Sequence, residues 1–234
     1  MNYYIGMSEK QAIFTLLGGK ISFYRGIYNP TSDAVWLAAF APLARVKSVL
    51  DVGIGTGGVS LCALVHNPDL KITGIDVSDK MLSECQKNFE LNKKDVNLIN
   101  SDIFSWKTAQ TFDLVITNPP YFMGTPAHHL AHHNIDLTLW IRKCIARVKP
   151  HGYFYMITDA ATVANVISEI NRSCGDIHIL PLFGAKKDAE RVMIGARHGT
   201  KGITVVRSGL DMNNSAVLRD GLTIDNMLAK LTMK

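Results

Sequence analysis

The chain has 234 residues, of which 47% are hydrophobic and 19% are charged, with a formal net charge of +5 and an isoelectric point near 9.0. This length and composition predict one compact domain with a substantial apolar core. The densest apolar stretch, at 34–43, is too short to span a bilayer, and no secretory signal opens the sequence, so we expect a soluble, cytoplasmic protein. The cysteines are far apart and form no Cys-x-x-Cys pair, which favours reduced core thiols over disulfides or a zinc site.

The excess of positive charge is compatible with a polyanionic partner, but by itself it is a weak indication. The basic residues fall into two groups, which could meet phosphates or simply face water. The first group precedes the domain core, and the second lies near the other end of the chain. These residues are Lys10, Lys20 and Arg25, and then Lys186, Lys187, Arg191, Arg197, His198 and Lys201.

From Lys47 onward, short runs rich in valine, isoleucine and leucine alternate with amphipathic stretches of helical length. This alternation is typical of a parallel sheet with helices on both faces, and it predicts an α/β fold. Residues 1–30 are expected to form an N-terminal extension that packs on a domain of residues 31–234. The predicted helices lie at 31–44, 57–66, 78–91, 135–148, 160–172 and 216–231. The seven predicted strands lie at 47–52, 71–76, 95–100, 112–117, 152–158, 177–183 and 190–197.

The first predicted strand leads into a glycine-rich turn with two possible ligands. Gly53, Gly55 and Gly58 satisfy the Gly-x-Gly-x-x-Gly pattern of a dinucleotide site. Asp76 ends the second strand roughly 20 residues later, where it would hold a ribose diol of either ligand. Asp51, inside the first strand, can receive the ammonium of an amino-acid tail but would oppose a pyrophosphate. S-adenosylmethionine carries such a tail, so Asp51 favours this cofactor over a dinucleotide.

A third acid, Asp102, follows the third predicted strand, where its carboxylate could accept a hydrogen bond from an adenine amine, with Ile103 or Phe104 beside the ring. Asp76 and Asp102 could each be a simple helix or turn cap. Acids at three successive strand ends nevertheless form a consistent set, because the carboxyl ends of parallel strands meet at one rim of the sheet. The expected cofactor-binding residues are Asp51, Gly53, Gly55, Gly57, Asp76, Val77, Asp102, Ile103 and Asn118.

The fourth predicted strand ends in Asn118-Pro119-Pro120-Tyr121. A planar amine, such as that of adenine or an amide, attacks a methyl donor only when hydrogen-bond acceptors take its protons. Asn118 offers a side-chain oxygen and Pro119 a carbonyl, while the two prolines add no N–H donor and Tyr121 supplies a ring for stacking. The alternative is an ordinary turn after a strand. We expect Asn118, Pro119, Pro120 and Tyr121 to form the catalytic segment.

Taken together, the glycine turn, Asp76, Asp102 and segment 118–121 resemble the class I methyltransferases that use S-adenosyl-L-methionine and modify planar nitrogens. The resemblance implies a Rossmann-like sheet of seven strands, mostly parallel, with the last strand antiparallel. More narrowly, the chain resembles the bacterial tRNA(Val) adenine-N6 methyltransferase family, whose members modify the adenine 3′ of the anticodon. This narrower resemblance implies tRNA as the partner. It also rests on segments 33–40, 121–122, 131–133 and 191–197.

Substrate contacts are expected from Tyr121, Phe122, His132, His133, Lys186, Lys187 and Arg191. The four histidines within 128–133 include pairs spaced by four residues, which can chelate a metal from one helix face. The segment lacks nearby acids or cysteines and follows Gly124-Thr125-Pro126, so we expect it to position RNA and expect no metal.

Three other possibilities remain open. The Asn-Pro-Pro-Tyr motif also marks enzymes that methylate a glutamine amide of release factors and relatives that methylate guanine in ribosomal RNA. Only about thirty residues precede the first predicted helix, fewer than the helical domain that glutamine methyltransferases carry, which favours RNA. The third possibility is a catalytically idle binding module, against which the intact Asp51, Asp76 and segment 118–121 argue. The oligomeric state, monomer or homodimer, stays open.

Overall fold

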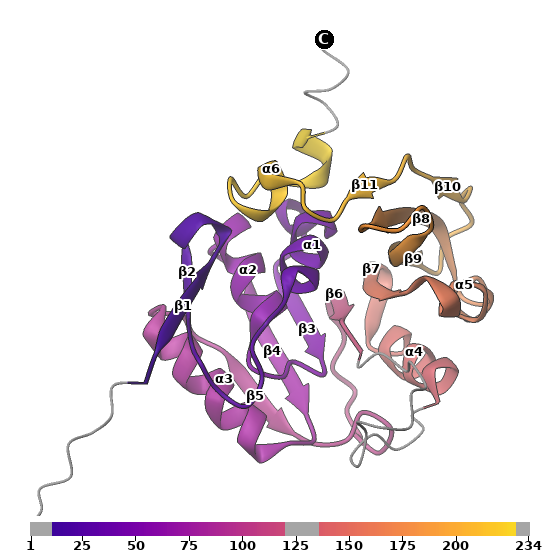
Figure 1. Ribbon diagram of the computed structural model, residues 1–234. Helices are drawn as coiled ribbons and strands as arrows, with labels where there is room; N and C mark the ends of the chain where they lie inside the picture. The colour runs from indigo at the N-terminus through magenta and orange to yellow at the C-terminus, as the bar shows by residue number, and fades with distance from the viewer. Residues whose placement is uncertain (1–10, 120–135, 228–234) are drawn as a thin grey trace, which may run out of the picture.

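The computed structural model describes residues 11–119 and 136–227, which form a central sheet with helices on both sides (Figure 1). The strands of the sheet lie in the order β10-β8-β9-β7-β6-β3-β4-β5, and β11 pairs with β8. The pairs from β5 to β7 are all parallel, whereas β9 is antiparallel to both β7 and β8. The predicted α/β sheet, mostly parallel with the last of its seven main strands antiparallel, is therefore confirmed. The strands are β3 (Ser48–Val52), β4 (Lys71–Asp76), β5 (Asn97–Asn100), β6 (Phe112–Thr117), β7 (Val148–Asp159), β8 (Cys174–Phe183), β9 (Ala189–His198), β10 (Val205–Val206) and β11 (Leu210–Asp211).

Side chains that alternate along the strands divide the core into two layers. Val49, Leu114 and Ile116 belong to the layer beneath α1, α2 and α3, while Leu50 and Val115 belong to the layer beneath α4 and α5. This alternation places one helix layer on each face of the sheet, as the sequence predicts. The helices are α1 (Ser32–Phe40), α2 (Gly58–His66), α3 (Asp79–Leu91), α4 (Leu137–Ile145), α5 (Val163–Ile170) and α6 (Ser215–Leu218).

The four cysteines are buried free thiols, as predicted. Burial raises the pKa of the Cys62 thiol to about 12, so this side chain is a neutral, inert core residue at neutral pH. Among residues 11–119 and 136–227, no helix is long and apolar enough to cross a membrane.

Several predicted boundaries are wrong, and the longest error lies at 216–231. There α6 ends at Leu218, because Gly221 adopts a left-handed backbone (φ 71°) that interrupts the helix before a further helical segment begins at Ile224. The helix predicted at 31–44 ends at Phe40. The two-residue strands β10 and β11 extend the sheet beyond the seven predicted strands.

The N-terminal extension contains a hairpin that the sequence analysis did not predict, formed by β1 (Ile13–Leu16) and β2 (Ile21–Tyr24). Figure 1 shows it beside α3, and side chains spaced along that helix hold it in place. The Ser22 N–H donates to Asn92, and the Tyr24 N–H donates to Asn88 (3.0 Å). Helix α3 therefore supplies the acceptors that a third strand would otherwise provide.

Asp113 ties together the amino ends of three strands, at the edge of the sheet opposite the predicted site. Its Oδ2 accepts from the Ser48 N–H (2.8 Å) and hydroxyl (2.9 Å) and from the Lys47 N–H (3.0 Å), and its Oδ1 accepts from Lys149 Nζ (2.8 Å). Burial by itself raises the pKa of this carboxyl, but the Lys149 ammonium and the Ser48 and Lys47 N–H groups outweigh it and hold the pKa well below its ordinary value.

Asp113→Asn is expected to lower the free energy of unfolding by about 1–2 kcal/mol at neutral pH, because charge-assisted hydrogen bonds are lost. The pKa of Asp113 is lower in the native state than in the unfolded state, where it is about 3.9. Asp113 therefore contributes fully to the free energy of unfolding above this pH, and the contribution is lost as the pH falls below it toward the native pKa. Denaturant unfolding measured between pH 3 and pH 7 should therefore show the variant and the wild type converging at acid pH. The exposed Asp95→Asn is the matched control. A constant difference across this range would contradict the assignment.

Candidate functional site

The glycine turn lies between β3 and α2 and is fixed against the end of β4. The N–H groups of Gly53 (2.8 Å) and Ile54 (3.2 Å) both donate to the carbonyl of Ile75. Gly57 has φ 90°, and a Cβ at this position would lie 2.9 Å from the Phe89 ring, so no other residue fits without a shift. The turn is thus held close to α3, with α2 beginning directly after it.

Asp76 lies at the end of β4, beside this turn. Its Oδ2 accepts from the Gly55 N–H (3.0 Å) and its Oδ1 accepts from the Ser78 N–H (2.9 Å). The carboxylate is half-buried and has lone pairs beyond these two bonds, so it can also accept from the hydroxyls of a ligand. Val77, the next residue, is 67% exposed and presents an apolar surface beside it.

Asp51 is buried under the turn, where the Ser60 hydroxyl of α2 donates to its Oδ2 (2.7 Å). Burial raises the pKa of Asp51 to about 7, and the negative charge of Asp76 adds to the effect, although the Ser60 hydrogen bonds oppose it. A cation bound near these two carboxylates would favour the ionised form of Asp51. The electrostatics of the turn therefore suit a cationic ligand.

Asp102 follows β5 and is exposed, with its Oδ1 accepting from the Phe104 N–H (2.9 Å). Ile103 is only 3% exposed and belongs to the core layer under α4, so its side chain is packed inside the domain. Of the two apolar residues expected beside a ligand ring, the half-buried Phe104 is the one nearer the surface.

Asn118 and Pro119 follow β6, and the pairing of β3 with β6 brings them beside the glycine turn. The last pair of this parallel ladder joins Val52 to Thr117, the residues that precede Gly53 and Asn118. Asn118 is half-buried and Pro119 is buried. Pro120, Tyr121, Phe122, His132 and His133 lie outside the described residues.

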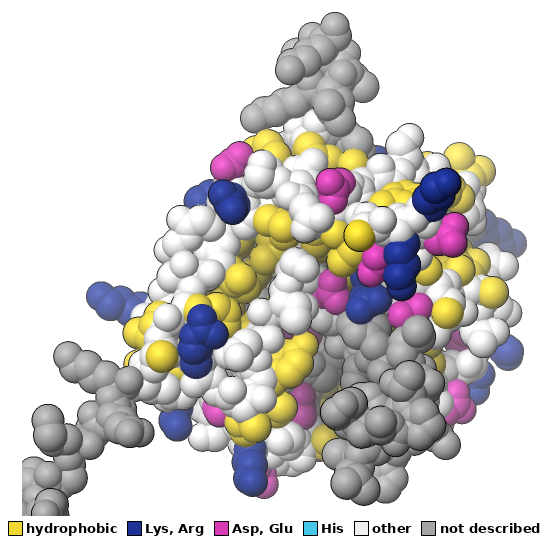
Figure 2. Space-filling model, in the orientation of Figure 1, with side chains coloured by type: hydrophobic (Ala, Val, Ile, Leu, Met, Phe, Trp, Pro, Cys, Tyr) yellow, Lys and Arg dark blue, Asp and Glu magenta, His cyan; other side chains and the backbone are white. Residues whose placement is uncertain are grey.

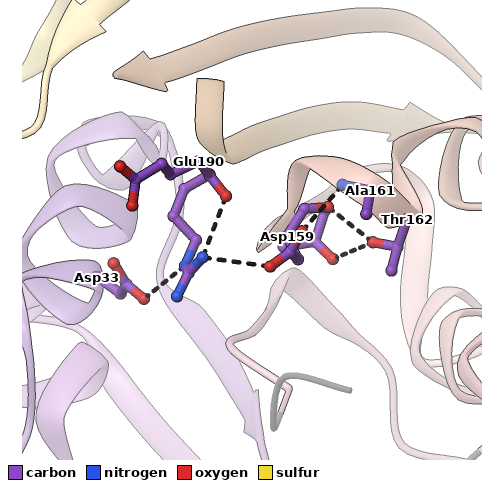
Figure 3. Close-up of polar contacts among 7 residues, drawn as sticks. Asp33, Asp159, Ala161, Thr162 and Glu190 are labelled. Atoms are coloured by element: carbon purple, nitrogen blue, oxygen red, sulfur yellow. Dashed lines mark hydrogen bonds and ion pairs between the residues drawn. The ribbon is translucent and has the colours of Figure 1, made fainter. Parts of the chain in front are cut away.

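Arg191 on β9 forms ion pairs with two acids, both labelled in Figure 3. Its guanidinium is 3.4 Å from Asp33 Oδ2 on α1 and 3.4 Å from Asp159 Oδ2 at the end of β7, and it donates to the Glu190 carbonyl (3.1 Å). A phosphate would have to compete with both carboxylates for this side chain. These contacts join α1 to the sheet, and the substrate contact expected of Arg191 stays a prediction.

Lys186 and Lys187 are exposed in the turn between β8 and β9. On the face seen in Figure 2, the described Lys and Arg side chains (dark blue) are scattered, and several lie beside acidic ones (magenta). In the part of the chain that the structure describes, no group of three or more His, Cys, Asp or Glu side chains could hold a metal ion. The histidines at 128–133 lie outside that part.

Two residues that the sequence analysis did not assign to the site also support it. Asn88, 2% exposed on α3, donates from its amide to the carbonyl of Thr56 in the glycine turn (3.0 Å). Trp140 on α4 donates from its indole N–H to the Thr117 hydroxyl and packs beside Gly53 at the start of the turn. For Asn88, the available signal is its spacing of four residues from Glu84 and Asn92, which places three polar side chains along one stripe of α3.

The class I methyltransferase fold is defined by the features described above. These are the sheet order, the glycine turn after β3, the acids at the next two strand ends and the Asn-Pro pair after β6. The chain belongs to the methyltransferase small domain family, whose model matches residues 32–180.

Solved structures agree with the fold. A predicted O-methyltransferase from Agrobacterium tumefaciens is 22% identical, with a TM-score of 0.65 over 77% of this chain and 88% of that one. The Thermus thermophilus 16S rRNA N2 G1207 methyltransferase is 19% identical, with a TM-score of 0.58 over 81% of this chain and 50% of that one.

Among curated proteins, the chain is similar to tRNA1(Val) (adenine(37)-N6)-methyltransferases. The protein from Shewanella halifaxensis is 37% identical over 101 residues, 41% of each chain. The protein from Escherichia coli is 28% identical over 155 residues, covering 62% of this chain and 63% of that one. The similarity thus spans between about two fifths and three fifths of the relatives' lengths.

Proposed function

We propose that this protein transfers a methyl group from S-adenosyl-L-methionine to the exocyclic N6 amine of an adenine in tRNA, the anticodon-loop adenine of tRNA(Val), in the cytoplasm. The observation that carries the proposal is the placement of Asn118 and Pro119 beside the glycine turn by the Val52–Thr117 pair. This pair of acceptors suits a planar amine, and the names of the curated relatives support adenine in tRNA as the substrate.

The residues around the turn fit S-adenosylmethionine. Asp76 can accept from ribose hydroxyls, and a nearby cation such as the ammonium of the methionine tail would stabilise the ionised form of Asp51, which burial disfavours. The Thr56 hydroxyl in the turn is buried and has no hydrogen-bond partner among the described residues. Asp102 can accept from the adenine amine of the cofactor. When bound, the cofactor supplies an electrophilic methyl group on a sulfonium.

In the proposed mechanism, the protein contributes position and acceptors rather than a strong base. The substrate amine donates its two N–H groups to the Asn118 side-chain oxygen and the Pro119 carbonyl, which directs the nitrogen lone pair toward the methyl carbon. As the N–C bond forms and the S–C bond breaks, the nitrogen becomes acidic and its proton passes to water. An adenine in a single-stranded loop is easily turned out of its stack, which suits an anticodon loop. Tyr121 is proposed to stack on this base. The residues proposed to place the RNA are Phe122, His132, His133, Lys186, Lys187 and Arg191.

The test is label transfer from methyl-labelled S-adenosylmethionine to three acceptors: a tRNA(Val) transcript, a release factor and ribosomal RNA. We expect label in the transcript, recovered as N6-methyladenosine by mass spectrometry, and none after guanine replaces the target adenine. Label in the release factor or in guanine would establish one of the two alternative substrates instead. Tight cofactor binding with no transfer to any acceptor would favour the idle binding module.

A further inference from the structure

A buried chain of two hydrogen bonds joins α4 to the ends of two strands at the site. Trp140 Nε1 on α4 donates to the hydroxyl of Thr117 (3.1 Å), and this hydroxyl donates to the carbonyl of Val52 (2.8 Å). Thr117 and Val52 are 0% exposed and Trp140 is 8% exposed, so water does not compete for these bonds. A hydroxyl carries one proton, and here it both accepts and donates, which fixes the Thr117 rotamer.

The positions of these residues in the chain make the arrangement informative. Val52 is the last residue before Gly53, and Thr117 is the last residue before Asn118. The two residues form the last pair of the β3–β6 ladder, so backbone pairing ends where the two site segments begin. The hydrogen bonds of the Thr117 hydroxyl therefore hold β3 and β6 together at the point where their backbone pairing ends.

The indole ring also contacts the other loops of the site. A Cβ built at Gly53 would lie 3.5 Å from the Trp140 ring, so the ring packs directly against the start of the glycine turn. The ring of Phe104, which follows Asp102, meets the indole edge-on with centroids 5.9 Å apart. One side chain thus lies beneath the glycine turn, the Asp102 turn and the strand end that carries Asn118.

We propose that Trp140 and Thr117 are positioning residues that fix Asn118 relative to the glycine turn, and that the rate of methyl transfer depends on their hydrogen bond. The inference rests on the proposed function in taking Asn118 as the acceptor for the substrate amine. A displacement of about 1 Å between reacting groups can lower a rate by about a hundredfold. The bond therefore matters for kcat more than for cofactor affinity, because Asp51 and Asp76 are held by separate contacts.

The test compares Thr117→Val and Trp140→Phe, which remove the acceptor and the donor, with Thr117→Ser, which keeps the hydroxyl. The first two are expected to lower kcat by about tenfold to a hundredfold, with the dissociation constant for S-adenosylmethionine changed by less than about threefold. Thr117→Ser should stay near the wild-type rate. Trp36→Phe is the matched control, because Trp36 is also buried and donates to a carbonyl, that of Met212 (3.0 Å), through a contact that involves none of the site residues.

A second readout is independent of activity. The protein has three tryptophans, so the indole N–H signals can be separated by NMR, and hydrogen exchange of the Trp140 indole should be faster in Thr117→Val than in Thr117→Ser. Wild-type kcat in both Thr117→Val and Trp140→Phe, an equal loss in Trp36→Phe, or unchanged indole exchange would overturn the inference. If the wild type methylates glutamine or guanine instead, the proposed function fails, while the same rate comparison with that acceptor still decides the positioning role.

Discussion

Asn118→Ala is expected to reduce methyl transfer by about 10²–10³-fold while the dissociation constant for S-adenosylmethionine changes little. The side-chain oxygen is proposed to accept from the substrate amine, an interaction that matters most as the nitrogen becomes cationic. Removing it should therefore lower kcat more than it raises KM. Single-turnover rates with a tRNA(Val) transcript and calorimetry with the cofactor measure the two effects separately.

Asn118→Asp keeps an acceptor oxygen at the same place and should retain more activity than Asn118→Ala. Asn171→Ala, at an exposed position after α5, controls for the loss of an asparagine elsewhere. Near-normal turnover in Asn118→Ala would show that segment 118–121 is an ordinary turn after β6.

Asp76→Ala is expected to weaken cofactor binding by about 10-fold to 140-fold, because charge-assisted hydrogen bonds are worth about 1.5–3 kcal/mol and every 1.4 kcal/mol is a factor of ten. The substitution removes the proposed ribose contact and also releases the Gly55 and Ser78 N–H groups that Asp76 holds. At saturating cofactor, kcat should recover to within about tenfold of the wild type.

Asp69→Ala provides the control for Asp76→Ala, since Asp69 is an exposed acid just before the opposite end of β4. It should leave the affinity unchanged. An Asp76→Ala protein that binds the cofactor as tightly as the wild type would contradict the placement of the ribose at the end of β4.

The parts of the fold that the sequence predicts well are those set by local pattern. Apolar runs such as 112–117 are buried on both faces, so composition alone marks them as strands. The glycine turn and Asp76 lie where parallel strands end, and the rule for ligands in such sheets brings them together. The hairpin of residues 13–24 was missed because its strands are only four residues long and depend on α3 for their partners.

Contacts between distant segments were beyond sequence reasoning. Trp140 has the spacing of an apolar helix residue, and nothing in that spacing indicates that its N–H meets Thr117. The sequence predicts a substrate contact for Arg191, which stays a prediction, but it does not indicate the ion pairs of this side chain. Its two acidic neighbours, Asp33 and Asp159, come from segments that only the folded sheet brings together.

The side-chain oxygen of Asn88 accepts a hydrogen bond from the Tyr24 N–H, and its side-chain nitrogen donates one to the Thr56 carbonyl. One amide group therefore supports both the hairpin and the glycine turn, and an apolar residue at position 88 would leave polar backbone groups on both sides unsatisfied. Shortened versions of the protein that begin at α1 would remove one of its two partners. Residues before Ser32 thus belong to the minimal unit to be expressed for crystallisation or redesign.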